Sequence, residues 1–423
     1  MLSWWRLQQR SERELRPLVQ RAWRLRDVQP ARSLSVSASP KENPEPLYPS
    51  SSSSSSFRAN DLAIISAQGE AKLPALESLQ FGKVFSPHMF SVKYSEGSGW
   101  TTPTVRPVEA ISVHPASSVM QYGVCCFEGM KAYVSREGQV LLFRPEMNMR
   151  RFHTSMQRLA LPSFDQDELL ECIKKLLLVD KSWIPKAEGF SMYLRPFAFG
   201  TSAALGVAPP SDAEISIIMS PVGPYFPEGL VPVNVLLDEV NVRAFPQGTG
   251  QYKIGGNYAP TLAHLPVAME HGCKQSLYTI EDGPGSEKYV AECGAMNVFF
   301  LLEHGNGEQE LVTPPLDGTI LPGVTRDSVL SLCREWNEVK VSERMISVRE
   351  LKDHASKGTL LEIFGCGTAC AIMPIKALVR TSGEKLQARL SNTNGSLLYE
   401  RLFKTLTDIQ YGNVKHPWQE YVL

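Results

Sequence analysis

One lysine lies among four glycines in the stretch Gly248-Thr-Gly-Gln-Tyr-Lys253-Ile-Gly-Gly-Asn-Tyr258. Glycine lets a backbone or a ligand approach closely, which an ordinary surface lysine does not require. A lysine that forms a Schiff base needs an enclosed niche, where its pKa falls and its amine becomes nucleophilic. Glycine-flanked lysines also occur in ordinary turns, so this stretch makes Lys253 a candidate that other segments must support.

A carboxylate precedes the apolar run from Val298 to Leu302, in the segment Glu292-Cys-Gly-Ala-Met-Asn297. This order predicts a glutamate at a turn beside the core, where glutamate is rare unless it is paired. A pyridinium nitrogen would be such a partner, because a carboxylate beside it keeps the nitrogen protonated and the ring electron-poor. An exposed turn glutamate is the alternative interpretation.

Three further segments have the composition of ligand-binding sites. In Ser191-Met-Tyr-Leu-Arg195 the period of two puts Tyr193 and Arg195 on one strand face, where together they can bind a carboxylate. Backbone N–H groups are open to a phosphate in Thr319-Ile-Leu-Pro-Gly-Val-Thr-Arg-Asp-Ser328 and in Gly365-Cys-Gly-Thr-Ala369. Taken singly, each segment is also typical of an ordinary edge strand or loop.

Taken in order, these segments resemble the branched-chain aminotransferases, which are pyridoxal-phosphate enzymes of fold type IV. The resemblance runs from about Phe81 to the C-terminus and is especially close to the animal mitochondrial form. It implies a mixed α/β (α+β) fold of two domains, with the cofactor at their interface and a homodimer that completes the site. The blocks that carry the resemblance are Phe127-Glu-Gly-Met-Lys-Ala-Tyr133, Phe143-Arg-Pro-Glu-Met-Asn-Met-Arg-Arg151, Leu161-Pro-Ser-Phe-Asp165, Arg195-Pro196, Tyr252-Lys-Ile-Gly-Gly-Asn-Tyr258, Glu292 to Asn297, Leu311-Val-Thr-Pro-Pro-Leu-Asp-Gly318, Ile320-Leu-Pro-Gly-Val324, Gly365 to Ala369, Ile409-Gln-Tyr-Gly412 and His416-Pro-Trp418.

The resemblance also implies roles for particular residues. Lys253 would form the Schiff base with pyridoxal 5'-phosphate and then shuttle the proton between the substrate Cα and the cofactor. The other cofactor-binding residues would be Glu292 at the pyridine nitrogen, Tyr258 at the phenolic oxygen, Arg151, Thr368 and the backbone of Val324 and Thr325 at the phosphate, and Arg243 nearby. The substrate-binding residues would be Phe81, Tyr122, Phe127, Tyr193, Arg195, Tyr225 and the backbone of Ala369, with Leu205 and Val207 from a second subunit.

The implied reaction is the reversible transfer of the amino group of L-leucine, L-isoleucine or L-valine to 2-oxoglutarate, giving branched-chain 2-oxo acids and L-glutamate. D-amino-acid aminotransferase and aminodeoxychorismate lyase share the lysine and the glutamate but not the branched-chain blocks. A non-catalytic scaffold is the alternative from another class of protein. Such a scaffold would have no chemical need to keep Lys253, Glu292, Tyr258, Arg151 and Thr368 together.

The sequence departs from the family pattern at two places. Ala295 stands where the animal enzymes have a threonine near the cofactor ring, so a hydrogen bond is expected to be missing. The mammalian Cys-x-x-Cys pair reads Cys370-Ala-Ile-Met373, which cannot close a disulfide. We therefore expect no redox switching by that pair.

Composition excludes several other classes of protein. The chain has 423 residues, 43% of them hydrophobic and 21% charged, with a formal net charge of −1. This composition predicts a soluble two-domain enzyme, and it does not favour a nucleic-acid partner. No apolar run approaches the roughly 18 residues needed for membrane insertion. The eight cysteines are expected to be reduced, and Cys366 and Cys370 lack the partner histidines of a zinc site, so no metal is predicted.

The N-terminal segment differs in composition from the rest. Its first 32 residues contain eight arginines against three acidic residues, interspersed with leucine and tryptophan. This pattern predicts a leader over residues 1–37 that directs the protein to the mitochondrial matrix, although a surface helix or disordered tail without a targeting role is an alternative. The predicted division continues with a low-complexity linker over 38–56, a small domain over 57–220, an interdomain loop over 221–231 and a large cofactor-binding domain over 232–423.

Several helices and strands can be located from periodicity. Ser163-Phe-Asp-Gln166 resembles a capping box that opens a helix, and a second helix is predicted after Ser396 with Gly412 as its stop signal. Strands are predicted over 190–199, 214–222, 232–237 and 296–303.

Overall fold

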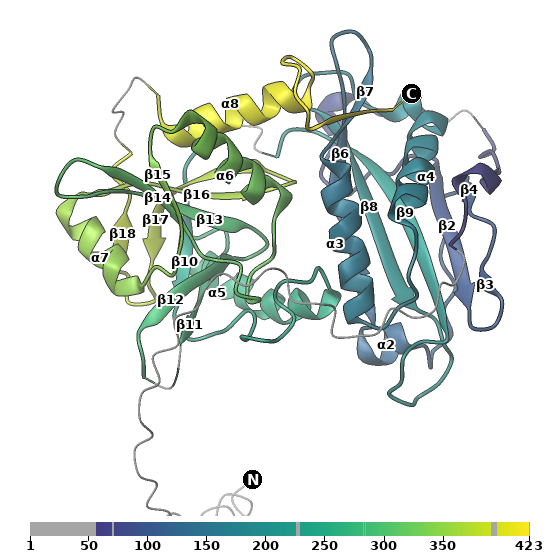
Figure 1. Ribbon diagram of the computed structural model, residues 1–423, viewed down its shortest axis with the longest axis horizontal. Coiled ribbons are helices and arrows are strands. Elements are labelled where there is room, and N and C mark those ends of the chain that lie inside the picture. Colours follow the sequence, from purple (N-terminus) through teal and green to yellow (C-terminus); the bar gives the residue numbers. More distant parts are fainter. Residues whose placement is uncertain are drawn as a thin grey trace, which may run out of the picture. The chain divides into compact units, whose positions relative to one another are not determined.

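Two β-sheets organise the computed structural model, which describes residues 56–69, 72–225, 229–281, 283, 285–390 and 396–422 (Figure 1). Both sheets belong to one compact unit of the chain, Ser54–Leu423. The predicted leader and all of the predicted linker except Ser56 lie outside the described residues.

The first sheet has the strand order β1-β4-β2-β9-β8-β6-β7-β19, with β3 paired to β2 and β5 paired to β8. Most of its neighbours are antiparallel. Its strands are β1 (Ala63–Ile64), β2 (His88–Ser95), β3 (Gly99–Trp100), β4 (Thr104–Pro107), β5 (Cys125–Phe127), β6 (Met130–Val134), β7 (Val140–Phe143), β8 (Ser191–Gly200), β9 (Asp212–Val222) and β19 (Gln419–Val422). The helices in this part of the chain are α2 (Ser118–Tyr122), α3 (Pro145–Arg158) and α4 (Gln166–Val179).

The second sheet has the order β12-β11-β10-β17-β16-β13-β14-β15, with β18 paired to β17. Parallel and antiparallel neighbours are mixed in it. Its strands are β10 (Val233–Asp238), β11 (Ser276–Glu281), β12 (Lys288–Cys293), β13 (Asn297–Glu303), β14 (Gln309–Thr313), β15 (Lys340–Glu343), β16 (Leu360–Gly367), β17 (Ala371–Val379) and β18 (Lys385–Gln387). The helices here are α5 (Leu265–Glu270), α6 (Val324–Trp336), α7 (Val348–Lys357) and α8 (Leu398–Gln410).

Helices cover both faces of the second sheet. On β13, Val298 and Phe300 pack in a core that includes Leu351 of α7. The alternate residue Phe299 packs on the other face, in a core with residues of α6 and α8 such as Leu402. A strand buried on both faces reads as a continuous apolar run, which explains the segment from Val298 to Leu302.

Among the described residues, α3 and α4 cover one face of the first sheet. Met192, Leu194 and Ala198 of β8 pack in a core with residues of α3 and α4. Because successive side chains of a strand point to opposite faces, Tyr193 and Arg195 lie on the face that these helices leave open. Functional side chains are therefore available on that face.

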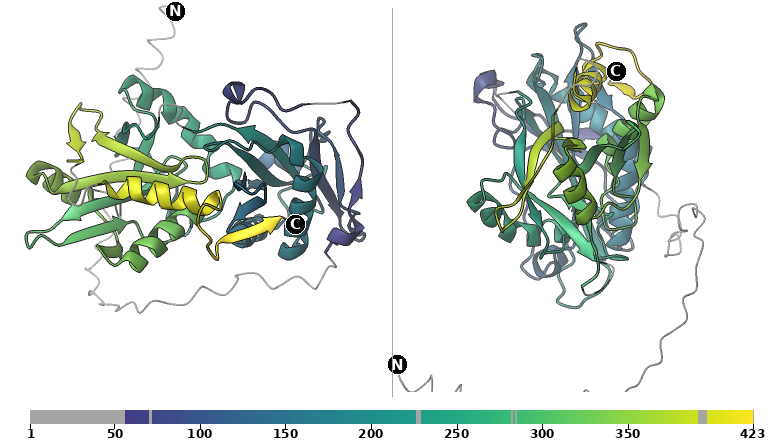
Figure 2. Two further views of the ribbon diagram at one scale, coloured as in Figure 1. Left: turned by 90° about the horizontal axis from the view of Figure 1, so that it is seen from above. Right: turned by 90° about the vertical axis from the view of Figure 1, so that its left-hand side faces the viewer.

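The C-terminal strand returns to the first sheet. Helix α8 contacts β16 and β17 of the second sheet, and β19 then pairs antiparallel with β7. Figure 2 shows this segment running from the yellow helix to the yellow strand at the C-terminus. The chain thus passes between the two sheets twice, after Val222 and again between Gln410 and Gln419.

The predicted strands over 190–199, 214–222, 232–237 and 296–303 correspond to β8, β9, β10 and β13 within two residues at each end. The helix predicted after Ser396 is α8, and Gly412 beyond its end has a left-handed φ of 71°. The capping box predicted at Ser163 is wrong. Helix α4 begins one residue after Asp165, whose carboxylate accepts hydrogen bonds from the N–H groups of Asp167 and Glu168. Aspartate caps as well as serine does, so composition could not choose between them.

Within the described ranges, the helices are all too short or too polar to cross a membrane. The same residues hold no group of three or more His, Cys, Asp or Glu side chains arranged to bind a metal ion.

Candidate active site

The Lys253 amine lies beside two neighbouring aromatic rings. Its Nζ is 4.8 Å from the ring centre of Phe127 and 5.2 Å from that of Tyr258, and these rings lie 4.8 Å apart. The Lys253 Nζ donates a hydrogen bond of 3.1 Å to the Tyr258 hydroxyl. The lysine is half-buried, so the amine is enclosed but reachable.

The backbone of Lys253 is fixed from two other elements. Its N–H donates to the Ser155 hydroxyl of α3 at 2.9 Å, and its carbonyl accepts from the Phe127 N–H of β5 at 3.0 Å. The surrounding glycines permit this approach. A Cβ at Gly255 would lie 2.7 Å from the Cys125 sulfur, and one at Gly250 would lie 2.3 Å from the Thr319 carbonyl oxygen. Side chains at these positions would therefore push the lysine loop away from its supports.

A buried ion pair lies near this lysine. Arg243 Nη1 is 2.7 Å from Glu292 Oε2, and each side chain is only 1% exposed. Glu292 also accepts hydrogen bonds from the Leu321 N–H at 3.2 Å and from Asn297 Nδ2 at 3.3 Å. Burial raises the pKa of the Glu292 carboxyl, and the positive charge of Arg243 opposes that rise. The alternative of an exposed turn glutamate is therefore wrong.

A second buried ion pair orients Arg151. Its Nε and Nη2 donate to the two oxygens of Glu128 at 2.6 and 2.8 Å, a bidentate geometry. Asn148 and the Gly129 N–H also donate to Glu128, at 2.8 and 3.1 Å. Burial opposes ionisation of Glu128, yet the Arg151 guanidinium holds the pKa of this carboxyl below its usual range.

The remaining guanidinium nitrogen of Arg151 points to the start of α6. Its Nη1 donates to the Pro322 carbonyl at 3.1 Å, and Gly323 is the N-cap of α6. Val324 and Thr325 form the first turn of this 13-residue helix and are buried. The first N–H groups of a helix lack partners inside the helix and attract anions. Arg151 and this helix start together form a site suited to a phosphate.

An aromatic cluster containing Arg195 lies on the open face of the first sheet. Arg195 Nη2 donates to the Tyr193 hydroxyl at 3.1 Å, and the Phe81 ring lies 4.9 Å from that of Tyr193 and 6.4 Å from that of Tyr225. A Cβ at residue 129 would stand 2.1 Å from the Tyr193 oxygen, so glycine is required there.

Phe127 joins this cluster to the lysine. The Arg195 Cζ lies 4.9 Å from the centre of the same ring that Lys253 contacts. The candidate lysine and the candidate carboxylate-binding arginine are therefore neighbours of one side chain, which could not be read from positions 127, 195 and 253 in the sequence.

Five predicted site residues lie outside these clusters. Leu205 and Val207 are 66% and 87% exposed, and Tyr122 donates its hydroxyl hydrogen to the Leu205 carbonyl. The other two, Thr368 and Ala369, lie in the turn between β16 and β17, where the Ala369 carbonyl accepts a hydrogen bond of 2.8 Å from Lys131 Nζ.

A family model described as amino-transferase class IV matches residues 125–378. The chain belongs to this family. The aminotransferase is 45% identical over 340 residues to the branched-chain-amino-acid aminotransferase of Monosiga brevicollis, an alignment that covers 80% of this chain and 86% of the relative. It is 43% identical over 367 residues to the mitochondrial form of Rattus norvegicus, covering 86% and 92%.

The fold of the aminotransferase is also found among solved structures. The branched-chain amino acid aminotransferase of Thermobaculum terrenum in its PLP form superposes with a TM-score of 0.61 at 23% identity, covering 80% of this chain and 99% of that one.

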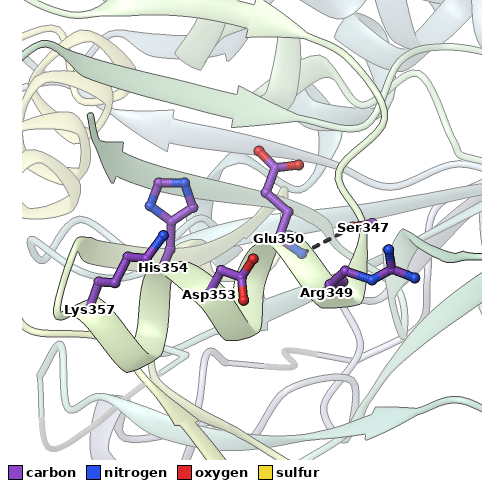
Figure 3. Close-up of a pocket in the computed structure, with 6 residues that line it drawn as sticks. All are labelled: Ser347, Arg349, Glu350, Asp353, His354 and Lys357. Atoms are coloured by element: carbon purple, nitrogen blue, oxygen red, sulfur yellow. Dashed lines mark hydrogen bonds between the residues drawn. The ribbon is translucent and has the colours of Figure 1, made fainter. Parts of the chain in front are cut away.

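A surface hollow of about 270 Å³ lies away from these residues of the aminotransferase. Figure 3 shows the side chains that line it along α7. Ser347 caps this helix by accepting a hydrogen bond of 3.0 Å from the Glu350 N–H. This helix cap explains the position of Ser347 in the hollow without a ligand. The lining residues are Ser347, Arg349, Glu350, Asp353, His354 and Lys357.

Three supporting residues of the aminotransferase were missed by the sequence analysis. They are Glu128, which holds Arg151, Ser155, which holds the Lys253 backbone, and Lys131, which contacts Ala369. Glu128 and Lys131 both stand in the block from Phe127 to Tyr133, which was quoted without roles for them. A charged pair inside a block that is otherwise apolar and aromatic was the available signal.

Proposed function

We propose that this aminotransferase moves the amino group of leucine, isoleucine or valine to 2-oxoglutarate, with Lys253 as its catalytic residue. The observation that carries the proposal is the contact of the Lys253 amine with the rings of Phe127 and Tyr258, together with the contact of Arg195 with the same Phe127 ring. The names of the relatives, which are branched-chain-amino-acid aminotransferases at 42–45% identity, support the substrate class.

Pyridoxal 5'-phosphate is the cofactor, and the buried groups fit it. Arg243 Nη2 is buried and has no hydrogen-bond partner among the described residues. Glu292 Oε1 receives a bond of 3.3 Å from Asn297, which leaves this oxygen with room for a stronger donor. A carboxylate whose pKa is raised by burial gains from a cationic N–H such as a pyridinium. When bound, the cofactor withdraws electrons from the substrate Cα and makes its proton acidic.

The residues that would hold the cofactor form three sets, one for each of its polar groups. Glu292 would face the pyridine nitrogen with Arg243 nearby, and Tyr258 would donate to the phenolic oxygen. The phosphate would lie at the start of α6, where burial and the Glu128 pair keep Arg151 fixed. The phosphate-binding set is Arg151, Thr368 and the backbone of Val324 and Thr325.

Lys253 would move the proton. Its amine would take the proton from the substrate Cα and deliver it to the cofactor carbon C4′, acting as general base and then as general acid. Tyr258, at 3.1 Å from Nζ, would hold the amine in position between these two steps. The hydrogen bonds from Ser155 and Phe127 fix the lysine backbone, which limits the positions that the amine can reach.

The open face of the first sheet would bind the rest of the substrate. Aromatic rings of Phe81, Phe127 and Tyr225 would line the space for a branched apolar side chain. Arg195 with Tyr193 would accept the distal carboxylate when glutamate or 2-oxoglutarate occupies the same space. The backbone of Ala369 would lie near the α-carboxylate.

The proposed active form is a homodimer in which Leu205 and Val207 reach the partner's site. Their large exposure in one chain, beside Tyr122, supports a covered position in the assembly. Mixing the inactive variant Lys253→Ala with Val207→Asp would test this. If Val207 acts across the interface, mixed dimers recover activity that neither variant has alone, and absence of recovery would contradict the arrangement.

The proposal includes the mitochondrial matrix as the location and the domain division given above. A mitochondrial relative and a cytosolic relative are similarly close, at 43% and 42% identity, so the arginine-rich leader carries this part of the proposal. Fusion of residues 1–56 to a fluorescent protein is expected to send it to mitochondria, and cytosolic fluorescence would contradict the address. The division into 57–220 and 232–423, joined by 221–231, is supported by β1 to β9 and β10 to β18, which belong to separate sheets, whereas β9 extends to Val222 and β19 near the C-terminus rejoins the first sheet.

A transamination assay tests the function. Leucine, isoleucine, valine, alanine and aspartate are offered as amino donors to 2-oxoglutarate, with D-alanine as a control for the D-amino-acid alternative. We expect turnover with the three branched L-amino acids and loss of it by at least about 1,000-fold in Lys253→Ala. A cofactor-loaded protein that is inactive on all three donors would overturn the substrate assignment. A protein that binds no pyridoxal phosphate would support the scaffold alternative.

A further inference from the structure

Lys131 is a cation of the open sheet face for which the proposed mechanism has no role. It lies on β6 directly opposite Tyr193 of β8, and its neighbours Met130 and Ala132 point into the helix-covered core. Lys131 and Tyr193 therefore share the face that also carries Arg195. The lysine lies within the row of side chains proposed to bind substrate.

The ammonium of Lys131 reaches from the first sheet to the second. Its Nζ donates to the Ala369 carbonyl at 2.8 Å, in the turn between β16 and β17. The Ala369 carbonyl and the Cys370 N–H belong to one planar trans peptide and point in opposite directions. This single hydrogen bond therefore fixes the direction of a backbone donor in the turn as well as the position of the turn.

The charge of Lys131 has no acidic partner. Among the described residues, no Asp or Glu oxygen forms an ion pair with this lysine, although most of its surface is covered. Burial lowers its pKa to about 8, with a small opposing effect of Cys370. A half-buried lysine is costly without a counter-charge, and a methionine would fill the same space without that cost. An anion bound beside the turn would supply the missing charge.

We infer that Lys131 is a positioning residue of the substrate site, which holds the Thr368–Cys370 turn against the first sheet and adds a positive charge for the substrate carboxylate. This inference rests on the proposed function, because it assigns the α-carboxylate to the turn that contains Ala369. Arg195 then binds the distal carboxylate or contacts the side chain, and Lys131 attracts the α-carboxylate that every substrate has.

The test measures binding of 4-methylvalerate, a leucine-shaped carboxylate without the amino group. Its dissociation constant is determined by calorimetry on the cofactor-loaded protein at pH 7 and pH 9.5, for wild type, Lys131→Met and Lys131→Arg. At pH 7 we expect binding to weaken about 10-fold in Lys131→Met, since a charged hydrogen-bond donor is lost. Absorbance of the bound cofactor is expected to stay unchanged.

The pH dependence separates a charge effect from a packing effect. Between pH 7 and 9.5 wild-type binding is expected to weaken relative to that of Lys131→Arg, because Lys131 loses its proton whereas an arginine stays charged. The other titratable groups near Lys131 are Tyr193 and Arg195 on the same sheet face and Cys370 and Tyr225 near the turn. Burial raises the pKa of Cys370 to about 12 and that of Tyr225 above its usual value. All groups other than residue 131 are common to the variants, so their effects cancel when affinities are compared at one pH.

Lys93→Met is the matched control, because Lys93 is an exposed lysine on β2 of the same sheet. Equal affinity of wild type and Lys131→Met at both pH values would overturn the inference and leave the proposed function intact if leucine is still converted. If Lys131→Met does not fold, wild type and Lys131→Arg are compared instead. An equal loss of affinity for 4-methylvalerate between pH 7 and pH 9.5 in these two proteins would overturn the inference. If the wild-type protein does not convert leucine, the proposed function itself is overturned, and the inference about Lys131 falls with it.

Discussion

The two central strands β8 and β13 are used in different ways. β13 buries alternate side chains on both faces, in separate cores formed with α7 on one side and with α6 and α8 on the other. β8 buries Met192 and Leu194 against α3 and α4 but leaves Tyr193 and Arg195 on the open face. A strand covered on both sides is scaffold, whereas a strand covered on one side can also form the wall of a site.

The two kinds of strand require different patterns of apolar and polar residues. A two-sided strand tolerates a polar residue only where that residue has a hydrogen-bond partner, as Asn297 at the start of β13 has in Glu292. A one-sided strand needs apolar residues only at every second position, and the others are free to carry function. Changes on β13 should therefore act on stability, and changes on the open face of β8 should act on substrate binding.

The largest expected effect is on the two-sided strand. Phe300→Ala on β13 is expected to lower the free energy of unfolding by about 3–5 kcal/mol, because the ring is fully buried. The matched change Phe197→Ala on the open face of β8 should cost clearly less, because that side chain is only half-buried. Urea denaturation of both variants measures the difference. Equal losses would show that the first sheet is not open on that face.

Next in size is a change in binding. Arg195→Met is expected to raise the KM for 2-oxoglutarate about 10- to 100-fold, because a charged hydrogen-bond donor is removed from its carboxylate. The KM for leucine should rise less, since leucine has no distal carboxylate. The melting temperature should remain close to that of wild type. Arg349→Met on α7, where the side chain is 76% exposed, is the control for loss of one positive charge.

A smaller effect concerns the edge of the second sheet. Glu310 of β14 accepts hydrogen bonds from Arg344 and His304, and although burial opposes its charge these partners lower its pKa to about 2. Because this folded-state pKa lies below that of an unfolded glutamate, the stabilisation is present above pH 4.5 and disappears as the pH falls towards 2. Glu310→Gln should therefore lower stability by about 1 kcal/mol at pH 6 and by much less at pH 2.5. An equal loss at both pH values would contradict the role of its charge.

The elements were more predictable than their contacts. Alternation in Ser191 to Arg195 and the apolar run from Val298 identified β8 and β13, because side-chain period and burial are local properties. The resemblance placed Lys253, Glu292 and Arg151 in one site, and the structure brings the lysine loop near Glu292 of β12 and Arg151 of α3. The exact capping residue of α4 was not predictable, since Ser163 and Asp165 are both good caps.

The supporting contacts were beyond sequence reasoning for a physical reason. Lys131 and Ala369 are 238 positions apart, and Ser155 and Lys253 are 98 apart. Such pairs are decided by how sheets and helices pack, which no local pattern records. Buried charges such as Glu128 are rare enough to deserve a search for a partner, but the sequence does not say which arginine it meets.

The double passage of the chain between the sheets restricts their relative motion. With one connection, two rigid bodies can rotate about any axis through the point where they are joined. A second connection, formed here by the segment from α8 to β19, favours rotation about the line through the two connections over other rotations. Separation of Lys131 from Ala369, which breaks their hydrogen bond, would then follow mainly that one rotation. Substrates would meet the same approach geometry in every turnover.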